Sequence, residues 1–317
     1  MTREELEERQ NWSLMQKIDH TLGTIDVFVG RLGIDNVYVS FSGGKDSTVM
    51  FDLARKINPN ILAVFCSTGN EYPDIIRFVH QLKDGGANIQ IIRPDMTPRQ
   101  VWQRYGFPLI GKEQAQKIHR IRINPESKSA KKWMSDKGYF KLAYQWRYLI
   151  NEPYDVTDIC CKKLKKDPFH RFEAETGRRP IIGVMASESN MRKGQYIRNG
   201  GCNVFGEKPS CRPLSIWNDD DVWAYIEMQK LPIADIYHKG AKRTGCVGCG
   251  FGAQFADDPR FRILLKTYPK LYNMVMNYTN NGVTFREALR KVLASQGLFL
   301  PDEMPPNLFS NHEQDYL

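Results

Sequence analysis

The sequence predicts an α/β protein built on a doubly wound parallel sheet, with helices on both faces. Short β-prone apolar runs alternate with segments whose apolar residues recur at helical spacing, and such alternation is typical of parallel sheets. Polar or charged residues directly follow each apolar run. The expected strands are residues 37–41, 61–66, 88–93 and 179–185, and the expected helices between them include 47–57 and 73–84.

Further segments surround this alternating part of the chain. A T-x-x-E capping box at Thr2 to Glu5, followed by helical apolar spacing, predicts an N-terminal helix. The C-terminal region has helical apolar spacing at 257–278 and 283–294 and ends in a proline-rich polar tail. The expected parts are an N-terminal helix in 1–30, a sheet-containing part in 31–253 with a basic helical insertion at 111–178, and a mostly helical C-terminal region and tail in 254–317.

The composition is that of an ordinary globular protein. Of the 317 residues, 41% are hydrophobic and 26% are charged, and no apolar run approaches the length of a membrane span. The N-terminus is charged rather than signal-like, so we expect a cytoplasmic location and no membrane partner. A net charge of +9 favours acidic ligands such as nucleotides or nucleic acid, without identifying one.

The most informative segment is the run Ser-Gly-Gly-Lys-Asp-Ser that begins at Ser42, called the phosphate loop below. It lies between a strand-like run and a helix-like pattern, a layout that presents backbone N–H groups to a phosphate. Gly43 and Gly44 allow positive φ and close approach of an anion. Lys45 adds a positive charge, and Ser42 and Ser47 add hydroxyl donors. The Walker A pattern is absent. A turn that only caps a helix is the alternative.

Polar side chains follow all four expected strands. In a parallel sheet the carboxyl ends of the strands meet at one edge, and ligands bind in the crevice outside those ends. The segments at these ends, which we expect to form one nucleotide-binding edge, are Ser40 to Ser47, Ser67 to Glu71, Arg93 to Asp95, and Met185 to Arg192.

The insertion is rich in positive charge and aromatic rings. Between Lys112 and Lys141 there are nine Lys or Arg and only three acidic residues, and four more lysines lie within residues 162–166. A solvated helical face is one interpretation. The other is a nucleic-acid-binding insertion, in which aromatic side chains between the cations stack on bases. The aromatic residues concerned are Trp133, Tyr139, Phe140, Tyr144, Trp146 and Tyr148.

Four of the seven cysteines form a pattern that predicts a metal centre. Cys160 and Cys161 are adjacent, and the C-x-x-C pair Cys246 and Cys249 follows after 84 intervening residues. Two adjacent cysteines do not easily fit a relaxed zinc knuckle, whereas four thiolates can hold an iron–sulfur cluster. Glycines around the second pair leave room for a bulky cluster and free backbone N–H groups to bond its sulfides. Zinc is the alternative.

The other three cysteines carry less specific signals. Cys202 and Cys211 lie in a stretch that also holds glycines and prolines, and they are either structural thiols or a second redox-sensitive pair. Cys66 ends an apolar strand, so we expect it to be a buried small hydrophobic residue.

The phosphate loop resembles the SGGxDS loop of the PP-loop ATP pyrophosphatase superfamily, whose members cleave ATP to AMP and pyrophosphate. From about Val37 to Cys249 the chain is similar to the phosphoadenosine phosphosulfate reductase-like family, which includes DndC-type proteins of DNA phosphorothioation. The four-cysteine pattern resembles that of [4Fe–4S] adenylyl-sulfate reductases. Further matching segments are 67–73, 105–108, 183–189, 212–214 and 217–226.

The resemblance implies a Rossmann-like fold of the adenine nucleotide alpha-hydrolase type and a set of site residues. The catalytic residues that it implies are Lys45, Asp46 and Ser47. The nucleotide-binding residues that it implies are Ser40, Ser42, Gly43, Gly44, Ser47, Thr68, Gly69, Glu71, Gly183, Met185 and Arg192, with Lys193 as a further candidate. The [4Fe–4S] ligands that it implies are Cys160, Cys161, Cys246 and Cys249.

Two departures from the reductases lead to a hypothesis about the reaction. Those enzymes usually carry a degenerate loop and use a cysteine near the C-terminus as nucleophile on sulfur. Here the loop is intact, and no cysteine follows Cys249. We therefore expect an ATP pyrophosphatase that binds ATP with Mg²⁺ and adenylates an acceptor for sulfur transfer. By resemblance to the DndC type, the acceptor is DNA or RNA, and a donor protein supplies the sulfur.

Two alternatives stay open. The first is a sulfonucleotide reductase that acts on adenylyl sulfate or its 3′-phosphorylated form, with Cys202 or Cys211 as the nucleophilic thiol. The second is a regulator that binds ATP and DNA without turnover.

Overall fold

The structure is a computed structural model that describes residues 1–304, apart from 136, 137, 139 and 257. The chain forms two compact units, each assembled from separate segments. Unit 1 comprises 1–67, 72–93 and 167–238, and unit 2 comprises 68–71, 94–166 and the chain from residue 239. The division into 1–30, 31–253 and 254–317 stays a prediction. Tyr139 and most of the predicted tail lie outside the described residues.

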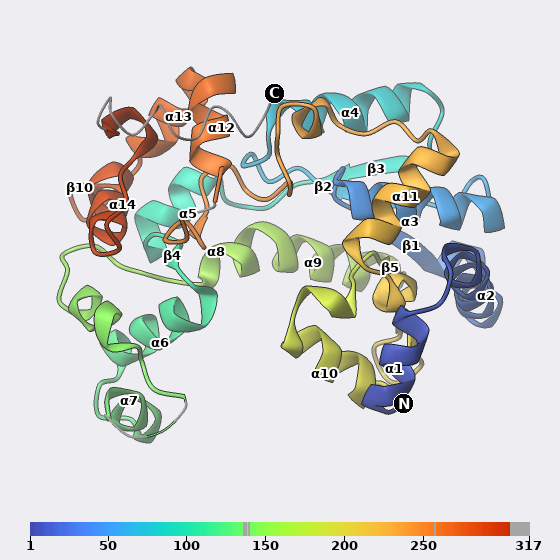
Figure 1. Ribbon diagram of the computed structural model, residues 1–317, viewed down its shortest axis with the longest axis horizontal. Helices are drawn as coiled ribbons and strands as arrows, with labels where there is room; N and C mark the ends of the chain where they lie inside the picture. The colour runs from blue at the N-terminus through green and yellow to red at the C-terminus, as the bar shows by residue number, and fades with distance from the viewer. Residues whose placement is uncertain (136–137, 139, 257, 305–317) are drawn as a thin grey trace. The chain divides into compact units, whose positions relative to one another are not determined.

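Unit 1 contains a six-stranded sheet in the order β3-β2-β1-β5-β7-β6. Figure 1 labels four of these strands, β3, β2, β1 and β5. Neighbouring strands are parallel except β6 and β7, which are antiparallel. Because β2 and β5 lie on opposite sides of β1, the strand order reverses there, and such a point is where open α/β sheets bind ligands. The strands are β1 (Val37–Phe41), β2 (Ala63–Cys66), β3 (Ile89–Ile92), β5 (Arg179–Ile182), β6 (Asn203–Val204) and β7 (Ser210–Cys211).

The two faces of this sheet are covered by different helices. Phe41 packs against Phe51 of α3 (Lys45–Ile57), with 5.4 Å between the ring centroids. Tyr38 packs against Phe172 of α9 (Asp167–Thr176), with 5.1 Å between the centroids. Residues an odd number apart on a strand face opposite sides, so α3 and α9 lie on opposite faces. The predicted doubly wound α/β class is confirmed.

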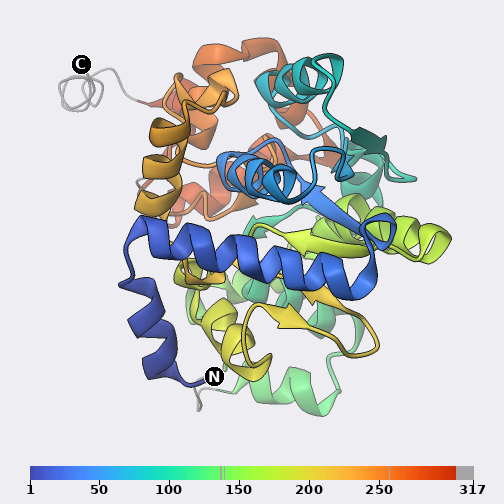
Figure 2. The same ribbon diagram turned by 90° about the vertical axis from the view of Figure 1, so that its right-hand side faces the viewer.

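The predicted N-terminal helix is two helices, α1 (Arg3–Gln10) and α2 (Leu14–Leu32), which meet at a bend (Figure 2). Each begins with a capping box, at Thr2 and at Ser13, and the second box starts a new helix where one continuous helix is expected. The remaining helical segments of unit 1 are η1 (Ile34–Asn36), α4 (Pro73–Asp84), η4 (Ala186–Glu188), α10 (Asn190–Arg198), η5 (Pro213–Ile216), α11 (Asp219–Gln229) and η6 (Asp235–Tyr237).

Unit 2 is mostly helical and packs around Trp102. This fully buried ring contacts Phe107, Tyr278 and Phe285, and its centroid lies 4.7 Å from that of Phe285. The strands of unit 2 form two short ladders, β4–β8 and β9–β10. The elements are α5 (Pro98–Tyr105), β4 (Leu109–Ile110), α6 (Lys112–Ile123), α7 (Lys128–Met134), η2 (Tyr144–Ile150), α8 (Ile159–Cys161), η3 (Lys162–Lys166), β8 (Gly250–Phe251), α12 (Arg260–Thr267), α13 (Pro269–Met276), β9 (Thr279–Asn280), β10 (Val283–Thr284), α14 (Phe285–Ala294) and η7 (Pro301–Glu303).

The helix predicted over 257–278 is two helices, α12 and α13. They are separated at Tyr268, whose φ of −138° and ψ of 64° are not helical. Pro269 begins α13, and a proline disfavours the helical conformation of the residue before it. Over the described part of the chain, none of the helices is both long and apolar enough to cross a bilayer.

Gly106 provides a test of the packing in unit 2. Its φ is 95°, and a Cβ added there would lie 2.3 Å from the carbonyl oxygen of Asp155. We expect Gly106→Ala to lower the free energy of unfolding by at least about 3 kcal/mol, because backbone would have to move. Urea denaturation followed by circular dichroism measures this change.

Gly282→Ala is the matched control. Gly282 also has a positive φ, 81°, but among the described residues no atom beyond its own chain neighbours lies within 4 Å of its added Cβ. Its substitution should cost only the left-handed backbone penalty of about 1–2 kcal/mol. Equal losses for the two variants would contradict the close packing at Gly106.

Candidate functional site

The phosphate loop connects the carboxyl end of β1 to the first turn of α3. Gly43 has a φ of 71°, and an added Cβ would lie 2.8 Å from the side chain of Ile75 on α4. Gly44 is the N-cap of α3 and makes no side-chain capping bond. Only glycine fits at Gly43, because both the backbone conformation and the neighbouring helix exclude a side chain.

Hydroxyl groups hold the loop in shape. The backbone N–H of Ser42 donates to Oγ of Ser47 at 3.1 Å, and that hydroxyl donates to the carbonyl of Gly44 at 2.8 Å. Thr48 Oγ1 also donates to this carbonyl, at 3.1 Å. Ser40, on β1, is paired in register with Val64 and Ile182 of the two neighbouring strands. Ser47 is therefore placed to organise the loop.

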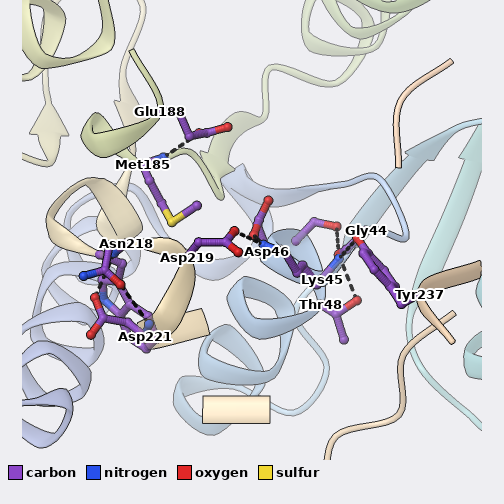
Figure 3. A network of polar contacts seen from close by, with 12 residues as sticks. Gly44, Lys45, Asp46, Thr48, Met185, Glu188, Asn218, Asp219, Asp221 and Tyr237 are labelled. Atoms are coloured by element: carbon purple, nitrogen blue, oxygen red, sulfur yellow. Dashed lines mark hydrogen bonds and ion pairs between the residues drawn. The ribbon is translucent and has the colours of Figure 1, made fainter. Parts of the chain in front are cut away.

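Lys45 is buried, and its ammonium lies between two carboxylates (Figure 3). Its Nζ donates to Oδ1 of Asp46 at 2.8 Å and also to Oδ1 of Asp219, the first residue of α11. Its backbone N–H donates to the hydroxyl of Tyr237 at 2.8 Å. Burial lowers the pKa of Lys45, but Asp46 and Asp219 outweigh it and hold that pKa above its ordinary value. The lysine is therefore charged over the physiological range.

The carboxyl end of β5 lies beside the loop. An added Cβ at Gly183 would lie 3.1 Å from the carbonyl oxygen of Asp46, so β5 closely approaches the first turn of α3. The backbone N–H of Met185 donates to Oε2 of Glu188 at 3.1 Å, and Glu188 also forms an ion pair with Arg192.

A cavity of about 110 Å³ opens at this strand end. Among its lining residues are Met185, Arg192 and Arg212, so the cavity has an apolar wall and two guanidinium groups. Burial lowers the pKa of Arg212 from its ordinary value. The structure therefore places Gly183 beside the loop and Met185 and Arg192 on one cavity at the end of β5. The assignment of these residues to a nucleotide stays a prediction.

Three predicted nucleotide-binding residues, Thr68, Gly69 and Glu71, belong to unit 2 and form a tight turn. The backbone N–H groups of Thr68 and Gly69 each donate to Oε2 of Glu71 at 3.1 Å. Gly69 has a φ of 77°. The Glu71 carboxylate is thus engaged by its own turn, and its assignment to the nucleotide stays a prediction.

The four predicted metal-ligating cysteines all line one pocket in unit 2, called the thiol pocket below. Cys160 and Cys161 come from α8, and Cys246 and Cys249 come from the loop before β8. The side chain of Trp102 donates to Sγ of Cys160 at 3.3 Å. Among the described residues, no group of three or more His, Cys, Asp or Glu side chains is arranged so that it could hold a metal ion.

Asn70 connects the Thr68–Glu71 turn to the C-x-x-C loop. Its carbonyl accepts the N–H of Val247 at 2.8 Å, and its Oδ1 accepts the N–H of Gly248 at 3.3 Å. Asn70 lines the thiol pocket, and its buried Nδ2 has no hydrogen-bond partner among the described residues. Buried donors are nearly always paired, and sulfur atoms of a cluster accept such hydrogen bonds. The described side chains are not arranged as a preformed metal site, but the chemistry of the soft thiol ligands and this spare donor suits an iron–sulfur cluster.

Gly248 in the C-x-x-C loop and Gly250 at the start of β8 were expected to leave room for a cluster, but both lie close to other protein atoms. An added Cβ at Gly248 would lie 2.6 Å from the Trp102 ring, and one at Gly250 would lie 2.6 Å from the carbonyl oxygen of Pro108. These glycines make room for protein atoms. Gly245, in contrast, faces open space.

The thiol pocket disfavours free thiolates. Burial raises the pKa of Cys160 and of Cys246, and it raises the pKa of Cys249 to about 12. Lys165 hydrogen-bonds to Cys246, whose charge raises the pKa of this lysine. Without a metal, the thiols of Cys160 and Cys249 are therefore protonated at neutral pH. Metal binding would deprotonate them, with Lys165 as a compensating cation.

The remaining cysteines are buried in unit 1, and all are free thiols. In the β6–β7 ladder Cys211 is paired with Asn203 and not with Cys202. Burial raises the pKa of Cys202 to about 12 and also raises that of Cys211. These observations favour structural thiols over a redox pair. Cys66 is buried at the end of β2, as expected for a small hydrophobic residue.

Several residues of the site were not singled out from the sequence. Asp219 and Tyr237 contact Lys45 from 174 and 192 residues away in the chain. Arg212 lies in segment 212–214, and the family resemblance of this segment was the only feature of the sequence that pointed to a functional role for Arg212. Asn70 was noted only as part of a matching segment, and its amide carries no motif of its own.

Comparisons with known proteins identify relatives. The adenosine 5′-phosphosulfate reductase of Pseudomonas aeruginosa (strain LESB58) is 26% identical over 227 residues, which cover 68% of this chain and 66% of that protein. The enzyme of the same name from Halalkalibacterium halodurans is 22% identical over 228 residues, which cover 71% of this chain and 79% of that protein. The chain therefore spans slightly less than two thirds of the Pseudomonas relative.

A solved structure, the phosphate complex of phosphoadenylyl-sulfate reductase from Candida auris, covers 72% of this chain and 93% of that one, with 15% identity and a TM-score of 0.44. The family model described as the phosphoadenosine phosphosulfate reductase domain matches residues 36–133 and 110–250, which is more than half of the chain. The DndC-type resemblance and the iron–sulfur cluster stay predictions. The chain belongs to the phosphoadenosine phosphosulfate reductase domain family.

Proposed function

We propose that the chain is an enzyme that cleaves an adenine nucleotide held at the phosphate loop, and that its thiol pocket holds a [4Fe–4S] cluster. The observation that carries the proposal is the convergence of four thiols on one pocket, from segments separated by 84 residues. This pocket is also lined by Asn70, which has a spare amide donor. A bound cluster would supply electrostatic or redox chemistry. The polar edge of the sheet in unit 1 supports the nucleotide part.

The relatives favour reduction of a sulfonucleotide, which was the alternative in the sequence analysis. Because they are named adenosine 5′-phosphosulfate reductases, the first candidate substrate is an adenine sulfonucleotide. A thiolate attacks its sulfur, the bond between sulfur and the bridging phosphate oxygen breaks, and AMP leaves with that oxygen. A second thiol then attacks the S-sulfonated thiol, which releases sulfite and forms a disulfide. Arg192 and Arg212 would stabilise the leaving phosphate.

The attacking thiolate requires a source other than the buried cysteines of unit 1. Burial raises the pKa of Cys202 and Cys211, which keeps them in the less reactive thiol form at neutral pH. We therefore assign the attack to a dithiol protein that acts as co-reactant and becomes oxidised.

The intact phosphate loop favours a second candidate, the ATP pyrophosphatase of the main sequence hypothesis. An acceptor oxygen attacks the α-phosphorus of ATP, the bond to the oxygen that bridges to the β-phosphorus breaks, and pyrophosphate leaves. Lys45 and the loop amides would stabilise the charge that develops on pyrophosphate. Mg²⁺, which Asp46 would help to hold, would supply further countercharge when bound. Sulfur from a donor protein then displaces AMP from the adenylated acceptor.

A nucleic acid is the acceptor that the basic insertion supports. Tyr144 is 81% exposed, and the guanidinium of Arg147 lies 5.5 Å from the centre of its ring. Phe140 is also exposed, whereas Trp146 is buried and belongs to the core of unit 2. Trp146 is therefore no stacking platform, contrary to the prediction for it. Binding of ATP and nucleic acid without turnover would make the chain a regulator.

Product analysis separates these reactions. Anaerobically reconstituted protein is incubated with adenosine 5′-phosphosulfate and a dithiol, or with ATP and Mg²⁺ in the presence of candidate acceptors. We expect Lys45→Ala to lower AMP formation at least about a hundredfold, because the loop loses its cation beside the phosphates. Lys56→Ala is the control, since Lys56 lies on the same helix and is exposed.

Each product pattern has one interpretation. Sulfite with AMP supports the reductase, and pyrophosphate with AMP supports the pyrophosphatase. Nucleotide binding without any product supports the regulator. An unchanged rate in Lys45→Ala would show that the phosphate loop is not the active site.

Cys160→Ser tests the cluster. We expect the anaerobically reconstituted protein to contain about four iron atoms and four acid-labile sulfides per chain, and this variant to lose them because one ligand is missing. Cys211→Ser should keep its iron, since Cys211 lies in unit 1, and circular dichroism checks the folding of both variants. One zinc per chain in the wild-type protein, or full iron content in Cys160→Ser, would contradict the proposal.

Alkylation tests the assignment of Cys202. At pH 8.5 a thiol with an ordinary pKa is about half ionised, whereas one with a pKa of about 12 is ionised to well under 1%. Iodoacetamide should therefore label Cys202 on the order of a thousandfold more slowly in the native protein than in urea, and labelling should accelerate as the pH rises. Peptide mass spectrometry measures both rates. Similar rates in the two conditions would restore Cys202 as a candidate nucleophile.

A further inference from the structure

Asp219 is a second carboxylate at the phosphate loop, and it comes from a different element than the loop itself. The Lys45 ammonium pairs with Asp46, its neighbour in the chain, and with Asp219 at the start of α11 (Figure 3). The Asp219 side chain is 63% exposed, so solvent and ions reach it. A negative charge therefore stands at the mouth of a loop suited to anions.

Helix α11 is fixed against unit 1 by other contacts. The hydroxyl of Tyr225 donates to Asp52 of α3 at 2.7 Å. Asp221 completes the capping box with Asn218 and pairs with the buried ammonium of Lys17 at 2.6 Å. The position of Asp219 thus follows from the packing of its helix.

The backbone N–H of Lys45 is also engaged from outside the loop. It donates to the hydroxyl of Tyr237, and the Tyr237 ring meets Trp223 of α11 edge to face, 5.6 Å between centroids. The Lys45 ammonium lies 5.6 Å from the centre of the Trp223 ring. A phosphate that bonds to both the ammonium and the amide of Lys45 must therefore replace a carboxylate and a hydroxyl.

We propose that Asp219 is a specificity-determining residue that makes the phosphate loop favour phosphate chains complexed with Mg²⁺ over the same chains without metal. A metal-free phosphate meets the Asp219 carboxylate as a like charge in competition for Lys45. A phosphate chain that carries Mg²⁺ brings its own countercharge, which removes the repulsion. The inference rests on the proposed function, because it assumes that the loop binds the phosphates of a nucleotide.

Calorimetric titration with inorganic pyrophosphate tests this inference, once with EDTA and once with excess Mg²⁺. In EDTA we expect Asp219→Asn to bind pyrophosphate about fivefold more tightly than the wild-type protein, a modest factor because the carboxylate is exposed. With Mg²⁺ the variant should bind no more tightly than the wild type. Asp220→Asn is the matched control: Asp220 is the next residue of α11, is exposed, and has no ion pair with Lys45 among the described residues.

Equal affinities of Asp219→Asn and the wild type in EDTA would overturn the inference, and so would an equal gain in Asp220→Asn. Lys45→Ala separates this failure from that of the proposed function. If Lys45→Ala binds pyrophosphate as well as the wild type, or if no protein binds it, the loop is not the phosphate site and both proposals fail. If Lys45→Ala loses binding while Asp219→Asn binds pyrophosphate in EDTA no more tightly than the wild type, the proposed site stands and the role of Asp219 fails.

Discussion

The absence of a side chain at Gly43 is the constraint on which the candidate nucleotide site depends. With a φ of 71° and Ile75 of α4 within 2.8 Å of an added Cβ, this position lets the chain turn sharply from β1 into α3. The turn leaves Gly44 as an N-cap without a side-chain bond and places Lys45 at the first position of the helix. A larger residue would separate the loop from α4 and move the helix N-terminus away from the edge of the sheet.

Both candidate sites are built from a local motif that a distant segment completes. In unit 1 the phosphate loop supplies Lys45, and α11 and η6 supply the carboxylate and the hydroxyl that contact it. In unit 2 the C-x-x-C loop supplies two thiols, α8 supplies two more, and Asn70 holds the loop through two hydrogen bonds. In both candidate sites the motif provides the polar or thiol groups, and the distant segment contributes hydrogen bonds or charge beside them.

Signals that act over a few residues were read correctly from the sequence. The parallel strands and α4 follow from apolar spacing and flanking turns, and α4 has the predicted bounds of 73–84. The break at Tyr268 was missed although Pro269 signals it, because the apolar spacing continues through it. The contacts of Asp219 and Tyr237 with Lys45 could not be predicted from local sequence, because they depend on how distant helices pack. Gly248 was expected to leave room for a cluster, whereas the structure shows that it leaves room for the Trp102 ring. This tertiary contact also has no local signal in the sequence.

The binding of a four-iron cluster by the thiol pocket of unit 2 can be tested by diffraction from anaerobically grown crystals, recorded on both sides of the iron absorption edge. We expect one compact iron peak in the anomalous difference map, bounded by the Sγ atoms of Cys160, Cys161, Cys246 and Cys249. A peak that appears only above the zinc edge, or an iron peak elsewhere, would contradict it.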